Sequence, residues 1–218
     1  MTAPRMTSRA RGFTLIELLL AISILAVIAV LGWRGLDSII RSRATLTADM
    51  EQTRGMQLAF AQLQSDCENL AGSALLHNRA FIQAEDGRIT LVRMVMAENQ
   101  PTQLQVVSYR VNADGVLTRR ESAYTRELTQ LDNLWQAALS DTDPAAAVAL
   151  QASVQGMSMR FWVPSAAVFQ TAANAGGWQA AAGVTTAGIT GLPTGMEVSL
   201  TLQGRQIPMV KSFLLGAL

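Results

Sequence analysis

One long apolar segment near the amino terminus constrains the possible fold of this chain more than any other feature. Residues 13–33 contain a single charged side chain, Glu17, and the next charge is Arg34. A run of about 20 apolar residues is enough to cross the roughly 30 Å hydrocarbon core of a bilayer. An ionised carboxylate in hydrocarbon costs at least about 2.5 kcal/mol, so Glu17 should be paired, protonated or functional. The segment therefore predicts a membrane helix whose one acidic residue needs a specific explanation.

The residues around Glu17 form a motif. The order Gly12-Phe13-Thr14-Leu15-Ile16-Glu17 is followed directly by the apolar run. This pattern resembles the amino-terminal segment of type IV prepilins and pseudopilins. The resemblance implies that prepilin peptidase removes residues 1–12 as a leader by cutting between Gly12 and Phe13, and that Phe13 is then N-methylated. It also implies that Glu17 meets the amino group of a neighbouring subunit during fibre assembly.

Two other interpretations of this segment are weaker. A cleavable secretory peptide has a shorter apolar region and a small-residue cleavage site at its far end, which this run lacks. An ordinary signal anchor fits the length of residues 13–33. Such an anchor does not need a glycine-aromatic junction followed by Glu17 at this spacing, so the prepilin interpretation is preferred.

Charge alone does not decide the orientation of the membrane segment, because three arginines lie close to each end of it. They are Arg5, Arg9 and Arg11 before the segment and Arg34, Arg41 and Arg43 after it. The resemblance implies a single-pass inner-membrane protein whose leader starts in the cytoplasm. Its carboxyl-terminal domain is then expected in the periplasm.

Residues 34–72 predict an amphipathic continuation of the helix. Apolar residues recur there at spacings of three and four, and no proline interrupts residues 5–100. A helix from Phe13 to about Ala71 would be about 88 Å long, far longer than a bilayer requires, so its second half must pack against something. Three glycines either allow bending or permit close packing, and both possibilities stay open. They are Gly32, Gly35 and Gly55.

The second half of the chain predicts antiparallel strands. Residues 80–84 and 88–95 flank the turn sequence Glu85-Asp86-Gly87, and residues 103–111 and 116–121 flank Asn112-Ala113-Asp114-Gly115. Both patterns are typical of hairpins. Imperfect alternation in these strands favours a sheet with one face packed on the long helix. The expected class is α+β, with residues 73–218 as a β-rich domain.

The remaining elements are expected from shorter patterns. Residues 127–139 have helical spacing, and four further segments resemble strands. These segments are 148–154, 157–163, 196–202 and 206–213. Residues 165–191 are rich in Ala, Gly and Thr, which predicts a long mobile loop with Trp178 packed back on the domain.

The order of these segments narrows the resemblance from prepilins and pseudopilins in general to one pseudopilin family. The stretch Val107–Arg119 is similar to a strand-turn-strand of the minor pseudopilin family called general secretion pathway protein J, and the segments from Leu150 to Leu202 follow that family's order. An enlarged Ala/Gly loop departs from it. The resemblance implies a pilin-like fold and assembly with I-type and K-type minor pseudopilins and the major pseudopilin, at the tip of the type II secretion pseudopilus. An alternative is a minor tip pilin of a type IV pilus, for adhesion or DNA uptake.

Composition argues against several other functions. Loss of residues 1–12 leaves 14 basic and 16 acidic side chains, a balance that favours no nucleic-acid partner. Cys67 is the one cysteine and His77 the one histidine, so a structural thiol and an ordinary helix-end or surface histidine are expected. Asp141 and Asp143 are an incomplete calcium site. No phosphate loop or nucleophile elbow occurs, so we expect no enzyme activity, no cofactor and no metal.

Overall fold

The computed structural model describes seven ranges of the chain: 13–77, 79–96, 100–142, 145–164, 177–181, 184–185 and 192–216. The chain forms two compact units, which divide between Glu51 and Gln52. The expected leader, with Gly12, lies outside the described residues.

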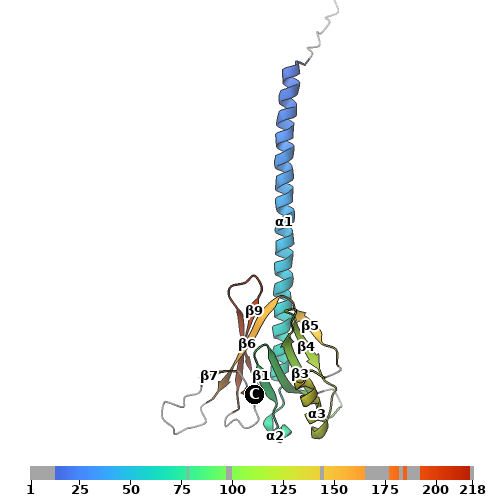
Figure 1. Cartoon of the computed structure of the whole chain (residues 1–218), viewed down its shortest axis with the longest axis vertical. Helices are drawn as coiled ribbons and strands as arrows, with labels where there is room; N and C mark the ends of the chain where they lie inside the picture. The colour runs from blue at the N-terminus through green and yellow to red at the C-terminus, as the bar shows by residue number, and fades with distance from the viewer. Residues whose placement is uncertain are drawn as a thin grey trace, which may run out of the picture. The chain divides into compact units, whose positions relative to one another are not determined.

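The first element is one long helix, α1, which runs from Leu15 to Glu68 (Figure 1). Its ends lie within four residues of the predicted bounds, 13 and 72. Asn69 ends the helix, and its side-chain amide donates a 2.8 Å hydrogen bond to the carbonyl oxygen of Ser65. The backbone N–H of Asn69 donates to the same oxygen at 3.2 Å, so the Ser65 carbonyl accepts two hydrogen bonds from one residue.

A six-stranded antiparallel sheet, sheet A, has the order β5-β4-β3-β2-β1-β8. The two predicted hairpins form its centre, with the turns at Gly87 and Gly115 in the left-handed conformation that glycine tolerates. The strands are β1 (Ile82–Glu85), β2 (Arg88–Val95), β3 (Gln103–Val111), β4 (Leu117–Glu121), β5 (Val148–Gln151) and β8 (Val184–Thr185).

A second antiparallel sheet, sheet B, has the order β10-β9-β6-β7. Its strands are β6 (Val154–Val163), β7 (Gly177–Ala180), β9 (Gly195–Leu202) and β10 (Met209–Leu214). Two short helices complete the described elements, α2 (Ser73–Leu76) and α3 (Leu128–Leu139). The combination of a long helix with antiparallel sheets confirms the α+β, pilin-like prediction.

The core of the second unit forms where the end of α1 meets both sheets. On the sheet B side, the ring of Phe60 lies 6.1 Å from that of Phe213 on β10. On the sheet A side, α1 faces the row of side chains that includes Tyr109. A Cβ on Gly55 would overlap the side-chain amide of Gln151 and lie 3.4 Å from the carbonyl oxygen of Leu150, so this glycine permits a close approach to β5. The role of Gly55 is thus close packing. The sequence left open whether this glycine permits close packing or bending of the helix.

The opposite face of sheet A is covered by α3, which Figure 1 shows beside β3. Residues Leu131, Trp135 and Ala138 of α3 are buried. Side chains at alternate positions of β3 therefore serve two different cores, one toward α1 and one toward α3.

Two predictions about the β region were wrong. The expected strand 148–154 is broken, because Ser153 has a positive φ of 59° and the chain passes there from sheet A to sheet B. The expected mobile loop 165–191 contains β7 and β8, which pair with β6 and β1. Trp178 packs back as predicted, since its ring meets Trp162 edge-on at 5.7 Å. The rest of that loop lies outside the described residues.

Candidate functional site

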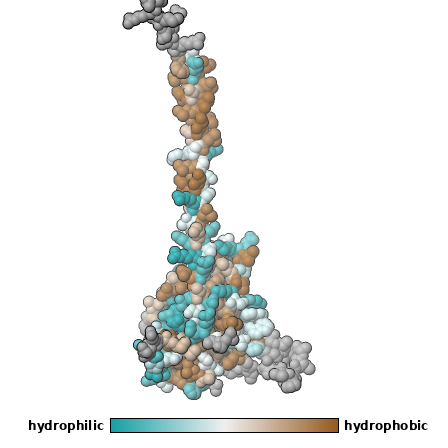
Figure 2. All heavy atoms as spheres, turned by 180° about the vertical axis from the view of Figure 1, so that it is seen from behind, coloured by the Kyte–Doolittle hydropathy of each residue, from teal (hydrophilic) through white to brown (hydrophobic). Residues whose placement is uncertain are grey.

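The first half of α1 presents an almost wholly apolar surface. Every residue from Phe13 to Leu36 is exposed, and Phe13 itself is 87% exposed. Figure 2 shows hydrophobic side chains along this part of the helix. By length and composition, α1 can cross a membrane. A monomer cannot bury this surface in its own core, so a bilayer or other protein helices must cover it.

Glu17 already has a local partner at the start of the helix. The backbone N–H and the hydroxyl of Thr14 each donate a 2.9 Å hydrogen bond to Oε2 of Glu17. In return, the N–H of Glu17 donates to the Thr14 hydroxyl oxygen at 3.4 Å. This reciprocal arrangement is a capping box, in which a Thr and a Glu three residues apart satisfy the free donors of the first turn.

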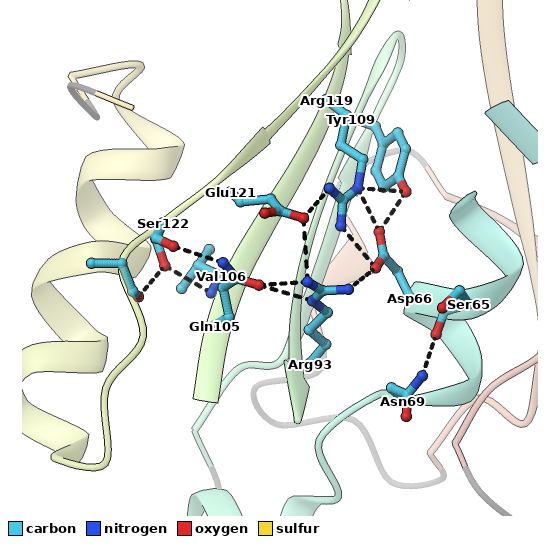
Figure 3. A network of polar contacts seen from close by, with 11 residues as sticks. Ser65, Asp66, Asn69, Arg93, Gln105, Val106, Tyr109, Arg119, Glu121 and Ser122 are labelled. Atoms are coloured by element: carbon cyan, nitrogen blue, oxygen red, sulfur yellow. Dashed lines mark hydrogen bonds and ion pairs between the residues drawn. The ribbon is translucent and has the colours of Figure 1, made fainter. Parts of the chain in front are cut away.

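The last turns of α1 hold a second acidic residue, Asp66, in a different setting (Figure 3). Asp66 is fully buried. Arg119 of β4 donates to it through two nitrogens, Nε at 2.8 Å to Oδ2 and Nη2 at 2.9 Å to Oδ1. Arg93 of β2 adds a 2.8 Å bond from Nη1, and the hydroxyl of Tyr109 of β3 also donates to the carboxylate. One helix residue is therefore bonded to three neighbouring strands.

The network extends outward from Asp66 and is electrically balanced. Arg93 donates to Oε1 of Gln105 at 2.9 and 2.7 Å, and the Gln105 amide donates to the carbonyl of Ser122 at 2.8 Å. Both arginines also bond to Glu121. Two guanidinium groups thus face two carboxylates, which is the condition under which buried charges are tolerated.

Two members of the network, Tyr109 and Arg119, have shifted pKa values. Burial raises the pKa of the Tyr109 phenol above its usual range, and the charge of Asp66 adds to this. For Arg119, burial acts to lower the pKa, but the hydrogen bonds and charge of Asp66 outweigh it and the pKa is raised. Tyr109 therefore stays neutral and Arg119 stays charged, as the hydrogen bonds require.

This buried network joins α1 to sheet A and is not built for chemistry on a ligand. Asp66 has no exposed surface, so no substrate can reach its carboxylate. Within the described part of the chain, no three His, Cys, Asp or Glu side chains gather as a metal site. The network positions the helix end, and the exposed half of α1 is a surface available for other molecules.

The structure describes two of the three residues that the sequence singled out. Phe13 and Glu17 lie at the start of α1, whereas Gly12 is outside the described residues. The capping role of Thr14 was missed, although Thr-x-x-Glu is a known signal for a helix start. Asp66 was also missed as a site. It falls in the spacing of the apolar series between Leu63 and Leu70, and an acid at a core position could have indicated a buried pair.

The other candidate residues of the sequence, the cysteine, the histidine and the Asp141 carboxylate, have structural roles or positions. Cys67 is fully buried, and burial raises the pKa of its thiol, to which the charges of Asp66 and Glu68 add. His77 ends α2 with a φ of 50° and is exposed, as expected for a helix-end histidine. Asp141 bonds to Arg110 and Arg120, and Asp143 lies outside the described residues.

Similarities to known proteins cover most of the chain. The sequence model of the family described as type II secretion system protein J matches residues 34–213. The model of the prokaryotic N-terminal methylation motif matches residues 7–33. The type II secretion system protein J of Klebsiella pneumoniae is 26% identical over 210 residues, which cover 91% of this chain and 91% of that protein.

Proposed function

The chain belongs to the type II secretion system protein J family, and from this membership we propose that it assembles with I-type and K-type minor pseudopilins at the tip of a periplasmic pseudopilus. The family match spans residues 34–213. The chain is accordingly a minor pseudopilin of the type II secretion system, a structural component of that system. The resemblance to prepilins is confirmed, and the alternative of a type IV pilus tip pilin is set aside because the matched family is a secretion family.

The anchoring of this pseudopilin follows from its apolar helix. The exposed apolar half of α1 anchors the chain in a membrane, and the carboxyl-terminal domain lies outside it. We further propose that α1 makes a single pass through the inner membrane and that the domain occupies the periplasm. The apolar surface would leave the bilayer by packing against the stems of neighbouring subunits, which replaces lipid contacts with protein contacts.

Processing is proposed to prepare the amino terminus for this packing. Prepilin peptidase would cut between Gly12 and Phe13, and Phe13 would then carry the methylated amino group. The match of the methylation motif to residues 7–33 supports this proposal. The exposed position of Phe13 at the start of α1 is consistent with access by an enzyme.

Glu17 is proposed to set the axial register of the stem. The observation that supports this most is that Glu17 is the one charged residue on an exposed apolar surface from Phe13 to Trp33. An amino group from a neighbouring subunit would give the carboxylate a counter-charge inside an apolar bundle, where an unpaired charge is costly. The capping box keeps the carboxylate oriented before such a partner arrives.

Mass spectrometry of the protein crosslinked in its own membranes and then purified tests the proposal. A methylated Phe13 terminus together with other minor pseudopilins is expected. Gly12→Val should leave the leader in place, while Gly32→Ala, a control glycine with open space around it, should be processed normally. An intact Met1 terminus without pilin-like partners would mean that residues 13–33 are only an anchor.

A series at the capping box separates charge from helix capping. Glu17→Gln removes the charge but keeps a side chain that can serve in a capping box, whereas Thr14→Val keeps the charge and removes the hydroxyl. We expect Glu17→Gln and Glu17→Leu to impair incorporation into the pseudopilus equally, and Thr14→Val to impair it less. Normal incorporation of Glu17→Gln alongside failure of Glu17→Leu would assign the role to the cap and not to the charge.

A further inference from the structure

The face of sheet A that α3 covers also contains a cavity of about 170 Å³. Three arginines line it, one from each of three adjacent strands: Arg88 of β2, Arg110 of β3 and Arg120 of β4. Among the described lining residues, Asp141, just after α3, is the one acidic residue. Three guanidinium groups and one carboxylate give the described lining a formal charge of +2, which attracts anions.

The arginines are held in place by contacts that use only part of their hydrogen-bonding capacity. Arg88 donates from Nη2 to the carbonyl oxygens of Ala138 and Leu139, at the carboxyl end of α3. Arg110 and Arg120 each donate one Nη1 bond to Asp141, the latter at 2.8 Å. Each guanidinium has five N–H donors, so most of the roughly 15 donors have no acceptor in these contacts.

Two buried atoms near the cavity lack a partner among the described residues: Nε of Arg120 and Oγ1 of Thr90. Strand pairing aligns Thr90 with Ser108 and Ser108 with Arg120. Paired residues of antiparallel strands lie on the same face, so both unpartnered atoms belong to one row, of which Ser108 and Arg120 line the cavity. Buried donors without an acceptor are rare in folded proteins, and a bound ligand is one cause.

We propose that this cavity binds a compact oxyanion, a chemistry shared by inorganic phosphate and by a carboxylate group of another protein. Guanidinium groups match the paired oxygens of both groups. Drug-sized ligands need about 300–1,000 Å³, so the cavity admits only a small group. The side chains of Arg110 and Asp141 are 48% and 47% exposed, which leaves the site open to solvent. The proposal does not depend on the tip position proposed above.

The test is a titration of the full-length chain in non-ionic detergent with sodium phosphate. Sodium chloride at equal ionic strength is the reference, and NMR cross-peaks of the arginine Nε–H groups are followed. The Arg120 peak, assigned by its loss in Arg120→Lys, should shift saturably with phosphate and not with chloride. Absence of a saturable shift for both phosphate and acetate would overturn the proposal.

Matched variants locate the site. Arg120→Gln should weaken binding about tenfold, because a hydrogen bond to a charged group is lost. Arg160→Gln is the control, since Arg160 pairs with Glu197 on sheet B and lies outside the cavity lining. An equal loss of binding in both variants would show attraction to general positive charge and would also overturn the proposal.

A second variant is expected to strengthen anion binding and keeps all three arginines. Asp141→Asn takes away the carboxylate that competes with the ligand, and asparagine tolerates the φ of 60° at this position. Binding should become tighter by a few-fold, and weaker binding would contradict the site. An acetate titration then distinguishes the sources: acetate binding as tightly as phosphate favours a carboxylate from a partner, and weaker binding favours free phosphate.

Discussion

Glu17 and Asp66 are both acidic residues on α1, yet they differ in burial and in the origin of their hydrogen-bond partners. Glu17 lies on an exposed apolar surface, and its described hydrogen bonds come from Thr14. Asp66 is fully buried and bonds to side chains of three strands. The Glu17 carboxylate stays available for a partner outside the chain, whereas every contact of Asp66 is used within the fold.

This difference indicates how one helix can serve two purposes. A charge that is satisfied by a neighbour three residues away depends on the first turn of the helix alone. A charge that is satisfied by residues 27 to 53 positions away exists only when the domain is folded. Changes at Asp66 should therefore alter folding stability, and changes at Glu17 should alter assembly.

The largest effect on stability is expected for Asp66→Ala. It would leave the buried Arg119 and the half-buried Arg93 with Glu121 as their remaining shared counter-charge. Breaking a buried ion pair from one side costs about 3–5 kcal/mol. Chemical unfolding of the full-length chain in detergent, followed by tryptophan fluorescence, measures the loss. Glu68→Ala is the control, since Glu68 is exposed and two residues away. Equal losses in the two variants would mean that the network contributes little to stability.

A smaller effect is expected for Tyr109→Phe, which removes the hydroxyl that donates to Asp66. A hydrogen bond to a charged group contributes about 1.5–3 kcal/mol. Tyr124→Phe is the control, because Tyr124 is 52% exposed. The same unfolding measurement applies, and a loss no larger than that of the control would remove Tyr109 from the network's energetics.

The same tyrosine predicts a dependence on alkaline pH. The pKa of Tyr109 is raised in the folded state above the ordinary value of 10.0. The folded state therefore holds this proton more tightly than the unfolded state, so the contribution to stability is complete below pH 10 and is lost as the pH rises further. The free energy of unfolding should fall by up to about 1.4 kcal/mol per pH unit above that point. Tyr109→Phe should show a shallower fall, and an unchanged slope would contradict the assignment.

Local patterns in the sequence predicted much of the fold. The long helix and the hairpins around Gly87 and Gly115 depend on short-range periodicity and turn residues, which a sequence displays directly. The corner at Ser153 and the pairing of β7 with β6 depend on contacts between distant segments. The Ala- and Gly-rich composition of residues 165–191 concealed those strands, because it is also typical of loops.

The residues of the candidate site also differ in whether a short sequence pattern could predict their roles. Glu17 was identified because a charge in an apolar run is visible in the sequence. The partners of Asp66 come from strands far away in the chain, and no spacing rule links position 66 to Arg93 or Arg119. The capping role of Thr14 was within reach of the sequence, since it depends on two residues three positions apart.

A local effect is expected for Thr14→Val. Loss of an N-cap hydroxyl destabilises a helix start by about 1 kcal/mol, and the effect should be confined to the first turn of α1. Amide hydrogen exchange of Leu15 to Leu18 in detergent should become faster, with no change in the domain. Thr45→Val is the control, because Thr45 donates from the helix interior to the carbonyl of Arg41. Exchange no faster than in the control would show that the capping box does not hold the helix start.

The smallest effect on folding is expected for Glu17→Gln, compared with the equivalent change Asp66→Asn. Both replace a carboxylate by an amide of nearly the same size. Glu17 lies in the first compact unit, and its described contacts do not reach the second, so unfolding of the domain should change by less than about 0.5 kcal/mol. Asp66→Asn removes the buried one of the two carboxylates that Arg93 and Arg119 share and should destabilise the domain clearly. If Glu17→Gln destabilised the domain as much as Asp66→Asn, the division between an assembly charge and a folding charge would fail, because both carboxylates would then belong to a single cooperative structure.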